Sequence, residues 1–88
     1  MEFSYFCFMK QVREVIEVNP EILGGQAVFK GSRVPVESLF DYLESGESLD
    51  LFLEEFPTVS REQALIVLEI ASRMLSNDHF IQLYEAAA

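Results

Sequence analysis

The 88-residue sequence predicts a mainly α domain, in which a short N-terminal β-hairpin is followed by three core helices and a short C-terminal helix. Segments of strand-like composition lie before residue 31, and after Pro35 the apolar period changes from two to near 3.6. Hydrophobic residues make up 50% of the chain, which is enough for a core. Because so small a domain is only marginally stable, we expect a second copy or a partner to help.

The first residues are apolar, but they do not read as a targeting segment. Glu2 stands where a signal peptide needs positive charge, and Lys10 interrupts the segment before it reaches a membrane-spanning length. We expect an edge strand or a packing arm and no membrane role. The single Cys7 cannot form an internal disulfide, which favours a reducing compartment, the cytoplasm.

Two segments, residues 14–18 and 26–30, have strand propensity. The turn between them contains Asn19, Pro20, Gly24 and Gly25, so we expect a hairpin. After it, Gly31 and Pro35 end the strand, and proline suits the first turn of a helix.

Helical spacing follows. Two consecutive stripes at i, i+3, i+4, i+7 predict two amphipathic helices, and they consist of Val36, Leu39, Phe40, Leu43 and then Leu49, Phe52, Leu53, Phe56. We expect the first helix to stop at Gly46, and the second to start with Ser48 as N-cap and to end at Pro57.

Ser60 and Gln63 have the spacing of a capping box, which predicts a third helix over residues 60–75. Its apolar residues cover more than one face, so it lies in the centre of the core or buries a second face in a partner. Asn77 and Asp78 can cap a fourth, short helix with one apolar side, and the final alanines should fray.

The formal net charge of −9 arises entirely after residue 33. The first 33 residues balance four basic against four acidic residues, whereas the rest has two basic and eleven acidic residues. This second part should repel phosphate and attract a basic protein surface.

The run from Asn19 to Val36 reads Asn-Pro-Glu-Ile-Leu-Gly-Gly-Gln-Ala-Val-Phe-Lys-Gly-Ser-Arg-Val-Pro-Val. It closely resembles the signature of the family called domain of unknown function 433, roughly Asn-Pro-x-x-x-Gly-Gly-x-Pro-x-x-x-Gly-Thr-Arg-hydrophobic-Pro-Val. Gly46 and the pair Phe56-Pro57 extend the likeness, which covers about residues 15–75. The sequence departs from the signature at Ala27, usually Pro, and Ser32, usually Thr.

The resemblance implies a homeodomain-like helix-turn-helix after a short hairpin, and an antitoxin-like protein paired with a nuclease toxin of the PIN type. It divides the single domain, residues 1–88, into an N-terminal arm (1–13), a family-like core (14–76) and a C-terminal helix with its tail (77–88). The signature residues with an expected structural role are Asn19, Pro20, Gly24, Gly25, Gly31, Pro35, Gly46 and Pro57.

A helix-turn-helix reads DNA with polar residues of its second helix. Here that helix offers only Arg61, Gln63 and Arg73, and acidic neighbours oppose phosphate binding, so charge disfavours DNA. Lys30 and Arg33, on either side of Gly31, could contact a phosphate or an acidic partner. We favour a structural role for Arg33, bonding backbone carbonyls or a carboxylate of the first core helix.

Catalysis and cofactors have little support. His79 is the only histidine, no second ligand stands at metal-binding spacing, and Cys7 has no evident base. We therefore expect no enzyme and no cofactor or metal.

Together with these residues, the family resemblance implies an antitoxin-like protein-binding module that neutralises a PIN-like nuclease toxin encoded nearby. We expect it to form a homodimer through the arm or the third helix, with interface residues Phe3, Tyr5, Phe6, Phe8, Ile66 and Ile70. The alternatives are a DNA-binding transcriptional regulator and a structural dimerisation module.

Overall fold

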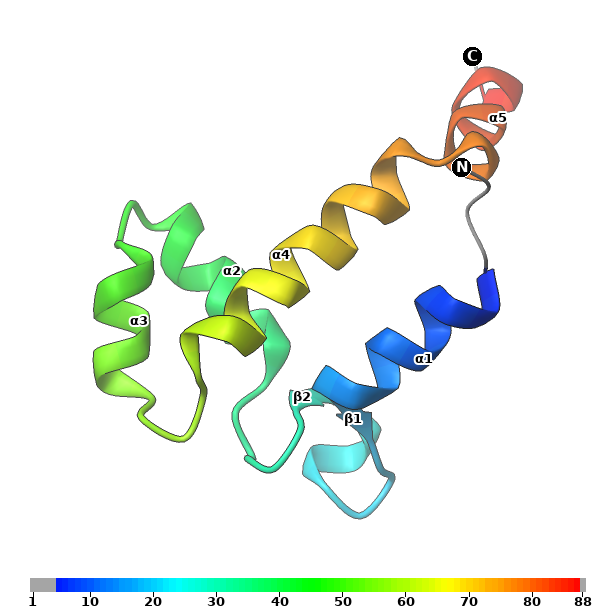
Figure 1. The fold of residues 1–88 in the computed structure, drawn as a ribbon. Helices are drawn as coiled ribbons and strands as arrows, with labels where there is room; N and C mark the ends of the chain where they lie inside the picture. The colour runs from blue at the N-terminus through cyan, green and yellow to red at the C-terminus, as the bar shows by residue number, and fades with distance from the viewer. Residues whose placement is uncertain (1–4, 88) are drawn as a thin grey trace.

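The computed structural model describes the backbone of residues 5–87 and the side chains of residues 10–87. In chain order its elements are α1 (Tyr5–Val15), β1 (Ile16–Val18), the 3₁₀ turn η1 (Leu23–Gly25), β2 (Ala27–Phe29), α2 (Val36–Glu44), α3 (Leu49–Glu55), α4 (Arg61–Ser76) and α5 (Asp78–Ala87) (Figure 1). The protein is therefore mainly helical, with a short antiparallel hairpin ahead of α2.

Helix α1 was not expected. The arm predicted as an edge strand or packing arm is helical from Tyr5, and the strand predicted from Glu14 begins only at Ile16. Val12 and Val15 stand at i, i+3, and Val15 is buried where α1 packs along α4. Packing of this face outweighs the strand preference of β-branched residues, which is a weak and context-dependent term.

The hairpin itself is confirmed. Strands β1 and β2 pair antiparallel with Ile16 opposite Phe29 and Val18 opposite Ala27, and Pro35 adds an isolated bridge to Val28. Val28 and Phe29 are fully buried. The hairpin therefore anchors the start of α2 to the core.

The predicted helix boundaries are also confirmed. The Ser48 hydroxyl accepts a hydrogen bond from Leu51 N (3.0 Å), and Ser60 and Gln63 form the full capping box at the start of α4. Helix α2 ends at Glu44, and Gly46 follows with φ of +85°, a left-handed conformation that glycine adopts without strain.

The core lies where the hairpin, α2, α3 and the first half of α4 meet. Its buried cluster consists of Val15, Phe29, Leu39, Phe52, Val59, Ala64 and Val67. On α2, Tyr42 packs against this cluster, whereas Leu43, expected on the apolar face, is exposed. The inward face of α2 is thus rotated slightly from the predicted stripe.

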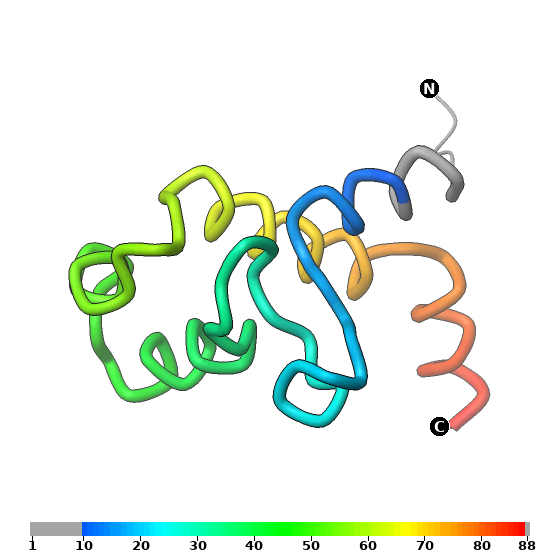
Figure 2. The backbone as a smooth tube through the Cα atoms, turned by 90° about the horizontal axis from the view of Figure 1, so that it is seen from below, coloured from blue at the N-terminus to red at the C-terminus, as the bar shows by residue number. Residues whose placement is uncertain are grey.

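Helix α4 runs beyond the core, and α5 turns off its far end (Figure 1). Figure 2 shows α5 on the opposite side of the molecule from α2 and α3. None of the described helices has the length and apolar character needed to cross a bilayer.

Candidate functional site

The signature residues of the hairpin loop hold backbone in place. The side-chain Oδ1 of Asn19 accepts a hydrogen bond from Glu21 N (2.9 Å). The backbone carbonyl of Asn19 accepts one from Ile22 N (2.8 Å). Gly24 and Gly25 have positive φ, and a Cβ at Gly25 would lie 3.7 Å from the Cα of Pro20. These residues form the reversal between β1 and β2.

The second half of the signature joins β2 to α2. Gly31 has φ of +81°, and the Ser32 hydroxyl donates to Phe29 O (2.8 Å) while accepting from Val34 N (3.1 Å). A threonine has the same hydroxyl, so Ser32 preserves this turn. Pro35 directly precedes α2, and Pro57 lies in the turn after α3.

The basic residues beside Gly31 are exposed. Lys30 donates from Nζ to Arg13 O (3.3 Å) on α1. The bonding expected of Arg33 is not formed: no hydrogen bond or ion pair joins it to any residue whose side chain is described. The Arg33 residue is exposed, so its guanidinium keeps its hydration.

The polar residues expected to read DNA on α4 are engaged within the chain. Gln63 accepts from Ser60 N (3.0 Å) and donates from Nε2 to Lys30 O (3.0 Å), so both ends of its amide are used. Arg61 pairs with Asp50 of α3, and Arg73 pairs with Glu69 (3.0 Å). Gln63 therefore ties the start of α4 to the end of the hairpin.

The most acidic stretch of the chain spans α2, α3 and the first turn of α4. Eight exposed carboxylates make up this acidic surface: Glu37, Asp41, Glu44, Glu47, Asp50, Glu54, Glu55 and Glu62. The same stretch, residues 36–62, has one basic residue, Arg61, whose guanidinium is already paired with Asp50. The acidic surface therefore presents a strong negative potential.

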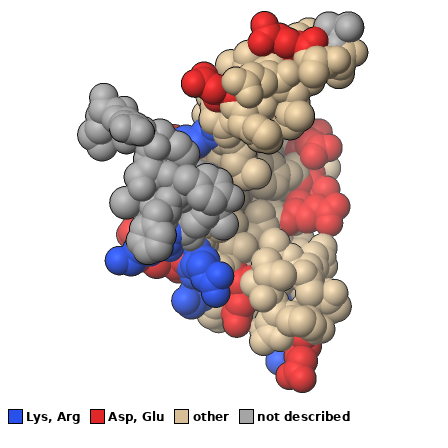
Figure 3. All heavy atoms as spheres, turned by 90° about the vertical axis from the view of Figure 1, so that its right-hand side faces the viewer, with Lys and Arg blue, Asp and Glu red and all other residues tan. Residues whose placement is uncertain are grey.

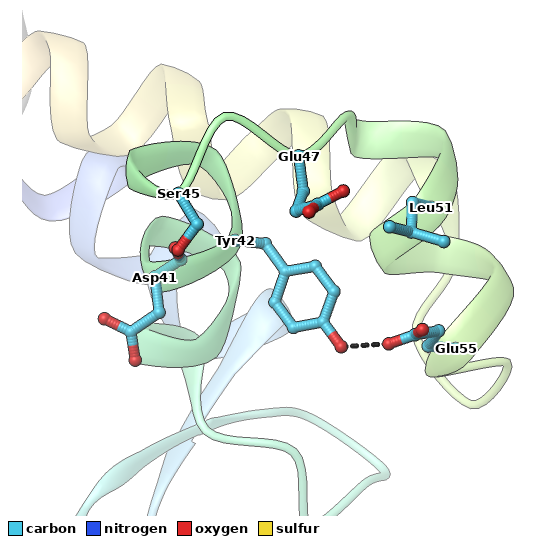
Figure 4. A pocket seen from close by; sticks show the side chains of 6 residues that line it. All are labelled: Asp41, Tyr42, Ser45, Glu47, Leu51 and Glu55. Carbon is cyan, nitrogen blue, oxygen red and sulfur yellow. Dashed lines mark hydrogen bonds between the residues drawn. The ribbon is translucent and has the colours of Figure 1, made fainter.

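A depression of about 350 Å³ opens in this surface between α2 and α3 (Figure 4). Its lining consists of Asp41, Tyr42, Ser45, Glu47, Leu51 and Glu55. We call it the Tyr42 pocket. It combines an apolar wall with three carboxylates, which is the environment that suits the stem and the charged head of an arginine or lysine.

Tyr42 connects the pocket to the core. Its ring lies edge-on to Phe52 and Phe56, with ring centroids 5.5 and 5.7 Å apart, and its hydroxyl donates a hydrogen bond to Glu55 (Figure 4). That hydrogen bond, followed by desolvation and the negative charges of Glu55 and Glu47, raises the pKa of Tyr42 above its usual 10.0. Sequence reasoning missed Tyr42, although it stands three residues after Leu39 on the same helical face.

A second surface lies at the C-terminal end. Residues 72–87, here called the C-terminal elbow, expose six large apolar side chains: Met74, Leu75, Phe80, Ile81, Leu83 and Tyr84. Of the interface residues expected from the sequence, Ile66 packs partly against the core, and Ile70 is only 5% exposed, so Ile70 offers no surface to a partner. Phe3 and the side chains of Tyr5, Phe6 and Phe8 lie outside the described residues.

His79 lies exposed in the first turn of α5. Within the part of the chain that the structure describes, no three His, Cys, Asp or Glu side chains are grouped closely enough to hold a metal ion.

Comparison with known proteins finds one matching family model, described as "Protein of unknown function (DUF433)", over residues 16–71. The chain is also similar to "Uncharacterized protein y4eO" of Sinorhizobium fredii, with 37% identity over 51 residues. That alignment covers 58% of this chain and 23% of the relative, so the chain spans less than a quarter of the relative's length. No solved structure matches.

Proposed function

Because the chain belongs to the family described as protein of unknown function DUF433, whose description assigns no activity, we propose a function from its surface: antitoxin-like, non-enzymatic binding of a basic, nuclease-type protein. The observation that carries this proposal is the acidic surface. It has eight exposed carboxylates and one arginine, Arg61, which is already paired with Asp50, one of the eight.

The acidic surface suits a nuclease because a nuclease binds phosphate with basic residues. Complementary potentials of this kind speed the encounter of two proteins and exclude wrongly charged partners. A protein that covers such a basic groove with carboxylates also competes directly with the nucleic acid. Binding here would therefore inhibit the nuclease without any chemistry.

The Tyr42 pocket supplies a specific anchor within this surface. An inserted arginine would lay its stem on Leu51 and the Tyr42 ring and direct its guanidinium toward Glu47, with Asp41 at the edge of the pocket. Buried arginine and aromatic anchors of this kind dominate the free energy of many interfaces. Glu55 is partly committed, since it accepts the Tyr42 hydrogen bond.

A DNA-binding regulator is the second candidate, and the order of α3 and α4, two helices joined by a short turn, is the observation that favours it. Three features weigh against it: both ends of the Gln63 amide are engaged, Arg61 is paired with Asp50, and the adjoining helices are acidic. Phosphate contacts supply most non-specific DNA affinity, and this surface repels phosphate.

The test is co-expression with the protein encoded by the adjacent reading frame. We expect a nuclease-type protein that co-purifies with this chain and is inhibited by it. Removing two pocket charges, with Asp41→Asn and Glu47→Gln together, should weaken binding at least about tenfold, mostly through faster dissociation, because the buried guanidinium loses its partners.

The matched control is Glu21→Gln with Glu85→Gln, which removes two exposed carboxylates outside the acidic surface and should change affinity about twofold at most. Equal affinity of the pocket variant and the wild type, or a neighbour that does not co-purify, would contradict the proposal. Salt-sensitive binding of the upstream duplex DNA at about 0.1 M salt would favour the regulator instead.

A further inference from the structure

The apolar stripe of α4 continues past the core. Ala64, Val67, Ala71 and Met74 follow one another at spacings of three or four residues, so they share one helical face. Ala64 and Val67 are buried, whereas Met74 is 55% exposed. The stripe therefore runs out of the interior onto a surface that no described part of the chain covers.

Helix α5 extends this surface. Phe80, Leu83 and Tyr84 stand at i, i+3, i+4, and Ile81 borders them, while Asp78, His79, Gln82 and Glu85 occupy the opposite arc. An amphipathic helix normally buries its apolar arc, yet α5 has no buried residue. Figure 3 shows the surface of α5, at the top of the view, as mostly uncharged, with acidic groups at its edges.

We propose that the C-terminal elbow is a self-association surface, and that its occupant is the elbow of a second copy of this chain. The charges of the elbow support this choice. Residues 72–87 contain one basic residue, Arg73, and two acidic residues, Asp78 and Glu85. Two elbows therefore repel each other only weakly, whereas two acidic surfaces would repel each other strongly. A basic partner finds few carboxylates here to pair with, whereas a second elbow offers a matching apolar arc.

The area of the elbow is sufficient for a dimer. Its six large apolar side chains are 39–71% exposed. Since side chains of this size present on the order of 200 Å² each, they expose roughly 600 Å² in total, close to the ~800 Å² per partner of a standard interface. An apolar surface of this size lies at the upper end of what a small monomer usually leaves open to water.

The pairing is expected to be symmetric. In a two-fold dimer the same surface contacts itself, and an antiparallel pair of α5 helices brings each apolar arc against its equivalent while the polar arcs stay in water. The acidic surface lies on the other side of the molecule (Figure 2), so the dimer keeps both Tyr42 pockets accessible. The inference thus goes beyond the proposed function and does not depend on it.

The test is sedimentation velocity of the full chain under reducing conditions, so that Cys7 cannot link two chains, from about 1 to about 300 µM. We expect the wild type to be a dimer at the upper end. Leu83→Glu places a carboxylate in the apolar arc and should raise the dimer dissociation constant at least about tenfold.

The control, Gln82→Glu, adds the same charge one residue away on the polar arc and should change the constant about twofold at most. Because α5 has no buried residue, both variants should keep the helical circular dichroism of the wild type. A wild type that stays monomeric throughout, or a dimer that responds equally to both substitutions, would overturn the proposal. Either result leaves the co-expression test intact, because that test probes a different surface.

Discussion

The two halves of α4 share one apolar stripe but have different surroundings. In the first half, Ala64 and Val67 pack against the hairpin, α2 and α3, and in the second half Met74 and Leu75 face solvent. The stripe of apolar residues at intervals of three or four runs through both halves. Periodicity thus identifies the apolar face of a helix, while its burial depends on how far the neighbouring elements reach along it.

The family match ends at the same place as the interior. Its last residue is 71, and Ile70 is the last buried residue of α4. The matched segment therefore contains the elements that complete the core, apart from the contribution of Val15 from α1. The elbow lies beyond it and adds surface to the protein without adding to its interior.

The largest effect that separates the two halves is expected from a pair of truncations one turn apart. Ile70→Ala removes a buried side chain and should lower the free energy of unfolding by about 2–4 kcal/mol, whereas Met74→Ala should change it by less than about 0.5 kcal/mol. Urea denaturation of both variants measures this. Both substitutions are made in the Leu83→Glu protein, so that self-association does not contribute to the measured stability. Similar losses for both would mean that the second half of α4 is packed after all.

A smaller effect is expected from the two N-caps. Ser60 caps α4 with a full capping box, and Asn77 caps α5 by accepting a hydrogen bond from Phe80 N (3.0 Å). Ser60→Ala should lower the free energy of unfolding by about 1 kcal/mol because α4 belongs to the core. Asn77→Ala should fray α5 and reduce helical circular dichroism, with the urea midpoint unchanged. A shift of that midpoint would show that α5 unfolds together with the core.

Much of the fold was predictable because its signals are local. Ser48, Ser60 and Gly46 act within a few residues of themselves, so their caps and turns could be predicted before any tertiary structure was known. Helix α1 was not predictable in this way. Its Val12 and Val15 favour a strand locally, and only contact with α4, some fifty residues later, gives their helical face a place to pack.

The candidate site divides similarly. The acidic surface follows from the excess of carboxylates after residue 33, so it was predictable from the sequence. The Tyr42 pocket depends on α2 and α3 meeting at an angle that places Tyr42 beside Glu55, thirteen residues away. That Arg33 bonds to none of the described side chains is likewise a tertiary outcome, because its bonding partners depend on where the neighbouring elements end.

The smallest effect concerns Tyr42, on the outer edge of the core. Its hydrogen bond to Glu55 raises its pKa, so the folded protein holds the phenolic proton to higher pH than the unfolded chain does. The stability gained from this proton is complete below the unfolded pKa of 10.0 and is lost as the pH rises through the higher folded pKa.

Spectrophotometric titration of tyrosinate tests this, with the Tyr42 transition obtained as the difference between the wild type and Tyr42→Phe. Its midpoint should lie above 10.0, and Glu55→Gln should lower it, since the charged acceptor is then replaced by a neutral one. Asp50→Asn, which removes a carboxylate outside the pocket, is the control and should leave the midpoint in place. A midpoint at or below 10.0 would mean that Tyr42 and Glu55 are not bonded in solution, and the Tyr42 ring would then be held in the pocket only by its packing against Phe52 and Phe56.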